Sequence, residues 1–180
     1  MFALATAMAL LAPSPSDAAK ELIASLDRTQ LQTVRSPFGD EGRRVWQYMP
    51  GPRDGLPLSE MTETQRERAL ALVRSAMSTK GFERVEGIRA LENVIVRSSY
   101  DPLFYWTHIF GEPGAGSNWA FQFEGHHLAL NMTFVDGDLI PTPSFMGGNP
   151  ANALSKPLED RKTTALALYR SLTEEQMGKA

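Results

Sequence analysis

The sequence predicts an α+β domain: an antiparallel β-meander over about residues 104–143, flanked by N- and C-terminal helices. Three observations support this fold class. Apolar residues recur at helical spacing toward both ends of the chain, whereas between 104 and 143 the apolar period shortens to two. Turn residues separate the segments of that central region. A length of 180 residues suits a single domain.

The composition excludes several classes of protein. There is no cysteine, so disulfides, thiolate zinc sites and cysteine nucleophiles are absent. The formal net charge is −3 and no basic stripe is visible, which argues against a nucleic-acid partner. Since no apolar run reaches about 18 residues, we expect no transmembrane segment. The hydrophobic share of 42% is typical of a folded globular chain.

The first 18 residues predict a signal peptide ahead of a domain over 19–180. Met1–Ala12 is almost wholly apolar, and Pro13–Ala18 ends the run with small residues and a candidate cleavage site, Ser16-x-Ala18. No Lys or Arg precedes Lys20, so an ordinary apolar terminus stays open as the alternative. A signal peptide predicts a secreted or periplasmic protein, whereas an ordinary apolar terminus predicts a cytoplasmic one.

Three capping boxes predict helix starts, because in each an Asp or Thr stands three residues before a Gln. They are Asp27–Gln30, Thr62–Gln65 and Thr173–Gln176. The three boxes are either independent caps or a trace of internal repetition.

Apolar spacing predicts the remaining helices. A helix over 66–80 ends at Gly81, and a second helix carries Val85, Ile88, Leu91 and Ile95 on one stripe. A last helix begins at the cap Ser155 and runs to about Tyr169. Its expected inner face is Leu158, Ala165 and Leu168.

The central region reads as strands and turns. Phe104–Phe110 predicts a strand, and the Gly-rich segment 111–118 predicts its connection to the next one. Trp119–Val135 is extended over 17 residues, or about 56 Å. Since the domain's radius of gyration is only about 15 Å, we expect this strand to bend, with Gly125 as the hinge. Asp136-Gly137-Asp138 predicts a hairpin turn.

The histidines indicate where chemistry is expected. All three, His108, His126 and His127, lie in the predicted meander. His126 and His127 with Glu124 form the candidate catalytic set and the candidate ligand set for a divalent metal ion, which is the one cofactor considered. Without metal, the same residues suit general acid–base work. The alternative is that this cluster is an internal hydrogen-bond network.

The geometry of a flat strand limits the metal hypothesis. Glu124 and His126 then share one face with Gln122, while His127 and Asn131 lie on the other. Adjacent histidines therefore bind one ion only if a bulge at Gly125 rotates one of them. Further candidate binding residues, expected around a small-molecule ligand, are Glu112, Trp119, Asn131 and Trp46, with Trp119 and Trp46 as walls.

A long pattern of residues resembles the domain-of-unknown-function family numbered 3500. It comprises Phe110-Gly111-Glu112-Pro113, Trp119, Phe123-Glu124-Gly125-His126-His127-Leu128-x-Leu130-Asn131 and Thr142-Pro143-x-Phe145-x-Gly147-x-Asn149-Pro150-Ala151. Upstream, Trp46-x-Tyr48-x-Pro50, Leu91-Glu92 and Asp101-Pro102 also match. The resemblance covers the chain from about Ala18 onward.

The resemblance implies no established activity, but it does imply export, because members often look exported. Members also continue beyond the equivalent of Ala180. We therefore expect a short or truncated member, whose domain is incomplete at its C-terminal end and exposes apolar surface there. The function predicted is metal-assisted or acid–base hydrolysis at the His/Glu cluster. The alternative is a non-catalytic binding or structural module.

Overall fold

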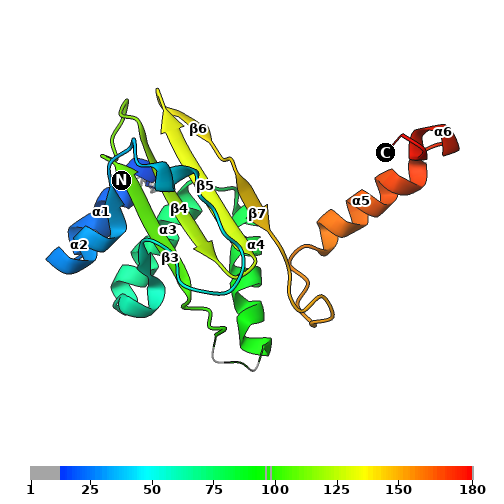
Figure 1. Ribbon diagram of the computed structural model, residues 1–180, viewed down its shortest axis with the longest axis horizontal. Helices are drawn as coiled ribbons and strands as arrows, with labels where there is room; N and C mark the ends of the chain where they lie inside the picture. The colour runs from blue at the N-terminus through cyan, green and yellow to red at the C-terminus, as the bar shows by residue number, and fades with distance from the viewer. Residues whose placement is uncertain (1–12, 96, 98, 180) are drawn as a thin grey trace, which may run out of the picture.

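The computed structural model describes residues 13–95, 97 and 99–179 (Figure 1). The helices are α1 (Pro15–Ser25), α2 (Arg28–Val34), η1 (Glu41–Arg44), η2 (Leu58–Glu60), α3 (Glu63–Ser75), α4 (Thr79–Ala90), η3 (Leu91–Val94), α5 (Glu159–Ser171) and α6 (Glu174–Met177). The strands are β1 (Arg35–Ser36), β2 (Leu56–Pro57), β3 (Tyr105–Gly111), β4 (Trp119–Gly125), β5 (Leu128–Val135), β6 (Asp138–Ile140) and β7 (Ser144–Met146).

The strands form one mixed sheet in the order β1-β3-β4-β5-β6. Strands β3 to β6 are an antiparallel meander, β2 pairs with β3, and β7 pairs with β5. Only β1, which runs parallel to β3, departs from antiparallel pairing in the described sheet. The predicted α+β class, with a meander flanked by helices, is confirmed.

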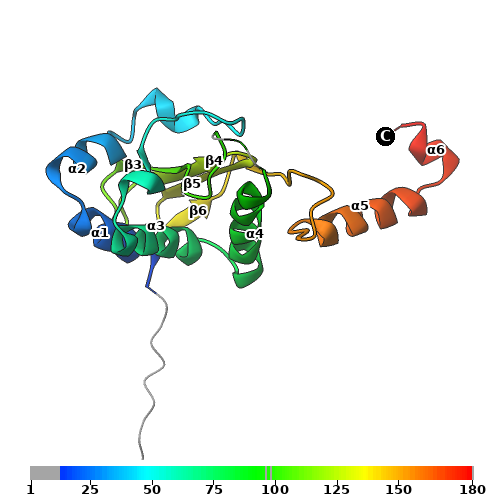
Figure 2. The same ribbon diagram turned by 90° about the horizontal axis from the view of Figure 1, so that it is seen from below.

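The two faces of the sheet have different chemistry. One face carries the large apolar residues, such as Phe121, Phe123 and Leu130, and packs on α1, α3 and α4. The other face carries Trp106, Glu124 and further polar residues, and the irregular segment between β1 and β2 covers it. Figure 2 shows α1 and α3 on one side of the sheet and this segment on the other. The candidate site lies under that segment.

The prediction of one bent strand over 119–135 was wrong. The chain reverses at His126 and His127, and Gly125 pairs with Leu128 across this two-residue turn. His127 takes up the left-handed backbone conformation, with φ of 57°. The reversal changes the side-chain faces, because Asn131 now lies opposite Gln122 and on the same face as Glu124.

Gly125 is required by close packing and does not act as a hinge. A Cβ at this position would lie 2.3 Å from Cδ1 of Tyr105, whose side chain is fully buried. We expect Gly125→Ala to lower the free energy of unfolding by about 1–3 kcal/mol, the usual cost of overpacking a core. Urea unfolding measures this loss. Gly39→Ala is the matched control, because nothing lies within 4 Å of its added Cβ. Equal effects of the two substitutions would contradict the packing argument.

The capping boxes are confirmed at all three helix starts. Asp27, Thr62 and Thr173 each accept a backbone N–H three residues on, and the glutamine side chain there accepts the N–H of the capping residue. The predicted end of the third helix is corrected: α3 stops at Ser75. Gly81 lies in the first turn of α4, where its N–H donates to Ser78 Oγ at 3.1 Å. A serine cap thus starts a new helix where a glycine stop was expected.

The predicted packing of the last helix is also corrected. α5 begins at Glu159 without a side-chain cap, so Ser155 does not cap it. Of its expected inner face, Ala165 and Leu168 are solvent-exposed, Leu168 to 63%, and Leu158 is half-buried. α5 and α6 project from the body of the molecule (Figures 1 and 2), and Asp160 joins α5 to Lys80 and Arg84 of α4.

The signal-peptide prediction concerns residues 1–18, most of which lie outside the described residues. α1 begins at Pro15, and Ala18 is buried in the core. Cleavage after Ala18 would therefore remove the first turn of α1. None of the helices in the described residues is both long enough and apolar enough to cross a bilayer.

Candidate functional site

A hydrogen-bond network on the polar face attaches the β1–β2 segment to the sheet. The side-chain amide of Gln122 donates to the carbonyl of Val45 at 2.8 Å and to Asn131 Oδ1 at 2.6 Å. Asn131 Nδ2 in turn donates to the carbonyl of Pro143 at 2.9 Å. Two adjacent strands and two loops are thereby held together, so Asn131, a predicted binding residue, has a positioning role.

Arg53 and Glu124 form a buried ion pair in the same layer. Their side chains are 4% and 8% exposed, and Arg53 Nε lies 3.9 Å from Glu124 Oε2. Arg53 also donates to the carbonyl of Gly125 at 3.1 Å, and its guanidinium lies 5.4 Å from the centre of the Trp106 ring. The backbone N–H of Gln47 donates to Glu124 Oε2 at 3.3 Å. Glu124 is therefore engaged with Arg53, and among the described residues no hydrogen bond joins it to a histidine.

Burial raises the pKa of Glu124 from 4.5 to about 7, because the hydrogen bond from Gln47 and the charge of Arg53 only partly offset desolvation. The folded state then binds more protons than the unfolded state between these two values. The stability contributed at this position therefore falls as the pH rises from about 4.5 to about 7.

Glu124→Gln removes this titration. The difference in unfolding free energy, wild type minus variant, is expected to be larger at pH 5 than at pH 8. Urea unfolding of both proteins at the two pH values measures it. A difference that stays constant or grows with pH would contradict a raised pKa at Glu124.

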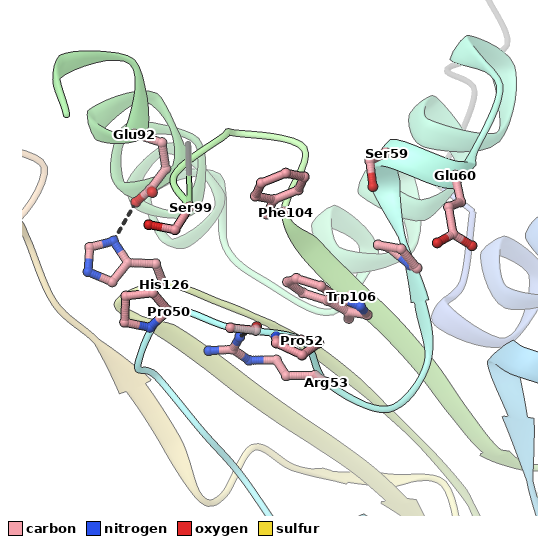
Figure 3. A pocket seen from close by; sticks show the side chains of 12 residues that line it. Pro50, Pro52, Arg53, Ser59, Glu60, Glu92, Ser99, Phe104, Trp106 and His126 are labelled. Carbon is pink, nitrogen blue, oxygen red and sulfur yellow. Dashed lines mark hydrogen bonds and ion pairs between the residues drawn. The ribbon is translucent and has the colours of Figure 1, made fainter. Parts of the chain in front are cut away.

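His126 is held by a carboxylate that the sequence analysis did not select. His126 Nδ1 lies 2.7 Å from Oε1 of Glu92 in η3, and the two side chains are 7% and 2% exposed. Tyr105 fixes the backbone beneath the ring, since its hydroxyl donates to the carbonyl of His126 at 2.9 Å. The ring of Tyr100 packs edge-on at a centroid distance of 4.8 Å. Figure 3 shows the His126–Glu92 contact at one end of a pocket.

The electrostatics of the pair favour a neutral imidazole. Burial raises the pKa of Glu92 to about 7, and the charge of Asp101 adds to the rise. Burial, together with the charge of Arg53, lowers the pKa of His126. When Glu92 is ionised it accepts a hydrogen bond from Nδ1–H of His126, which leaves the lone pair on Nε2. Within the described residues, Nε2 has no hydrogen-bond partner.

The cavity beside the pair has a volume of about 430 Å³. Its walls are mainly apolar, with Phe104 and Trp106 on one side and prolines from the β1–β2 segment on another (Figure 3). Polar atoms come from Ser59, Glu60, Arg53 and Ser99, besides the His126–Glu92 pair. This mixture of ring surfaces and a few polar groups is typical of a small-molecule pocket.

His127 belongs to an aromatic group outside this cavity. Its ring packs edge-on against Tyr48 at 6.4 Å and Phe145 at 6.3 Å between centroids. Its backbone N–H donates to the carbonyl of Tyr48 at 2.7 Å, and its carbonyl accepts from Gly147 at 2.8 Å. Burial and the neighbouring His126 lower its pKa. Trp46 stacks on Tyr48 in the same group and does not line the cavity.

The structure separates the other predicted site residues. Trp119 is a core residue on the opposite face of the sheet, where it stacks on Phe134 at 4.4 Å. Glu112 lies at the far end of β3, exposed and paired with Arg35. His108 Nε2 lies 3.0 Å from Ser36 Oγ, in a separate polar cavity. Trp119 therefore cannot be a pocket wall, because alternation along β4 turns it away from Glu124.

The predicted metal ligands do not converge either. Across 13–95, 97 and 99–179, no three His, Asp or Glu side chains lie close enough together to hold a metal ion. The rings of His126 and His127 are 4.3 Å apart between centroids, but Glu124 is engaged with Arg53.

Sequence reasoning missed Glu92 and Arg53 as site residues. A signal for Glu92 was present, because Leu91-Glu92 belongs to the pattern that resembles the family. Arg53 stands in a Pro- and Gly-rich loop, and no motif marks it.

One family model matches nearly the whole chain. The model of the family described as "Protein of unknown function (DUF3500)" matches residues 12–180. The chain belongs to the DUF3500 family. The family match covers the elements that build the pocket, from α1 to β7, and it extends through α5 and α6. No curated protein and no solved structure gives a significant match.

Proposed function

We propose that this DUF3500 protein is a hydrolase that uses His126 as general base, oriented by Glu92, on a small ring-bearing molecule. The observation that carries the proposal is the 2.7 Å contact between His126 Nδ1 and Glu92 Oε1 at the wall of a cavity of about 430 Å³. A carboxylate behind one imidazole nitrogen fixes the tautomer in which the other nitrogen takes up protons.

The chemistry follows from this tautomer. Nε2 removes a proton from a water molecule while the water oxygen bonds to the carbonyl carbon of an ester or amide. The bond from that carbon to the leaving group then breaks, and the imidazolium returns the proton to the leaving group. Ionised Glu92 stabilises the imidazolium that forms between these steps.

The cavity walls define the substrate class. The rings of Phe104 and Trp106 and the faces of the prolines offer flat apolar surface, which suits an aromatic or saturated ring. Ser59, Ser99 and Glu60 can hydrogen-bond to polar substituents of that ring. The proposal places the reaction outside the cytoplasm, on the strength of the apolar run Met1–Ala12.

A panel of chromogenic esters and amides of small ring compounds tests this proposal. We expect hydrolysis with a kcat/KM that rises with pH near 7, because Glu92, whose pKa is raised to about 7, must ionise to orient His126, and burial lowers the pKa of His126 so that its imidazole is already neutral there. The same panel is run with added chelator and with added zinc or manganese, which tests the metal-assisted variant. Absence of turnover across the panel at every pH would count against catalysis.

A non-catalytic role is the second candidate, and the amide network favours it. Gln122 donates to the β1–β2 segment, Asn131 donates to the carbonyl of Pro143, and the charge of Glu124 is paired with Arg53. If the cluster serves the fold alone, Gln122→Leu should lower stability while ring compounds fail to bind the cavity. Binding of such compounds, followed by protein NMR, separates a binding module from a purely structural network.

A further inference from the structure

Helices α1, α3 and α5 repeat one pattern of side chains. Each carries Ala, then Leu three residues later, then a large apolar residue, and then Ser two residues further on. The pattern comprises Ala19, Leu22, Ile23 and Ser25 in α1; Ala69, Leu72, Val73 and Ser75 in α3; and Ala165, Leu168, Tyr169 and Ser171 in α5. In all three helices the serine hydroxyl donates to the carbonyl of the leucine, at 2.6 to 2.7 Å.

The end of each helix shows that α5 corresponds to α1. Leu26 after α1 and Leu172 after α5 have the same extended backbone, with ψ of 145° and 143°. A capping box then starts the next helix at the following residue, Asp27 in one case and Thr173 in the other. After α3, by contrast, Ala76 has ψ of 6°. The pair α5–α6 therefore repeats α1–α2.

The two copies differ in what covers them. In α1–α2, Ala19, Leu22 and Leu26 are buried against α3 and the sheet. The equivalent Leu168 is 63% exposed and the neighbouring Tyr169 is 59% exposed. Exposed apolar side chains at the positions that form a core contact elsewhere in the same chain indicate a docking surface.

The contacts of α1–α2 define the partner that such a surface fits. α1 lies along α3, and the side chains of the two capping-box glutamines, Gln30 and Gln65, hydrogen-bond to each other at 2.9 Å. Gln65 also donates to the carbonyl of Ser25 at 2.7 Å. A fitting partner therefore carries a helix that starts with a capping-box glutamine and lies on an apolar sheet face.

We propose that α5–α6 is the first helix pair of a second unit of this fold, and that it docks on that unit as α1–α2 docks on α3. Gln176 and the carbonyl of Ser171 then meet the partner's capping-box glutamine, while Ala165, Leu168 and Leu172 enter its core. The body of another copy of this chain is a poorer partner, because its own α1 already covers α3.

A tandem protein tests the docking directly. Residues 1–177 are followed by residues 32–180, so that α5–α6 stands where α1–α2 stood before the second body. We expect this body to fold. The calorimetric enthalpy of unfolding should be about twice that of the 180-residue chain, since enthalpy scales with the number of ordered residues. Limited trypsin digestion should leave the second body intact.

The matched control carries Leu168→Glu and Leu172→Glu in the first α5–α6 only. The second body should then be digested and the enthalpy should return to about the single-chain value, while the first body stays folded. A positive control, residues 1–177 followed by 13–180, keeps the second body's own α1–α2. Digestion of the second body in the unsubstituted tandem, while this positive control resists, would overturn the proposal. So would dimerisation through α5 faces with the second body unfolded.

Discussion

His126→Gln is expected to lower kcat/KM for the substrate class found with the ester and amide panel by about 10²–10⁴-fold, the usual contribution of a general base. Glutamine fills similar space but cannot take up the proton. Because His126 is held by Glu92 at 2.7 Å, Glu92→Gln should also reduce the rate, by leaving the imidazole without its charged partner. Steady-state kinetics at several pH values measure both effects, and the rise of kcat/KM with pH near 7 should be lost in His126→Gln.

His127→Gln is the matched control for this experiment. It makes the same substitution one residue further along, in a side chain that packs among Tyr48 and Phe145, outside the cavity. We expect it to retain the wild-type pH profile. If His127→Gln abolished turnover while His126→Gln retained it, the assignment of the base would be wrong.

Arg53→Met is expected to lower the free energy of unfolding by about 3–5 kcal/mol, the cost of removing one partner from a buried ion pair. Arg53 and Glu124 are both almost fully buried, and Arg53 also binds backbone carbonyls on the β1–β2 segment and at Gly125. Its loss leaves a buried carboxylate without a cation and several carbonyls without a donor. Urea unfolding at pH 8 measures the effect.

Arg44→Met is the control for Arg53→Met, since Arg44 lies on the same segment, is exposed and, among the residues that the structure describes, pairs only with Glu41. Its effect should stay within about 1 kcal/mol. The Arg53→Met deficit should also shrink at pH 5, because Glu124, with its pKa raised to about 7, is then protonated. A deficit independent of pH would indicate that the carbonyl contacts, rather than the charge of Glu124, dominate.

Local signals in the sequence predicted the parts of the fold that local physics controls. The three capping boxes form as expected, because a cap satisfies backbone groups within four residues of itself. The turn at Asp136 and Gly137 also forms, since both residues tolerate the positive φ that it needs. The change of apolar period was enough to predict the α+β class.

The chain reversal at His126 and His127 could not be predicted from local signals in the sequence. Neither residue is a usual turn former, and His127 has a φ of 57° while its N–H and carbonyl are both held, by Tyr48 and Gly147. Since one residue of shift inverts every later side chain on a strand, this missed turn placed Asn131 on the wrong face.

Composition and local spacing therefore determined the fold class, the helix starts and the short turn, because those depend on neighbours along the chain. The site depends instead on contacts between residues that are far apart in the sequence. Glu92 and His126 are 34 positions apart in the chain, and Arg53 and Glu124 are 71 positions apart. The packing of η3 and of the β1–β2 segment against the sheet brings Glu92 to His126 and Arg53 to Glu124. Burial there excludes water, and a buried charge is stable only beside a matching group.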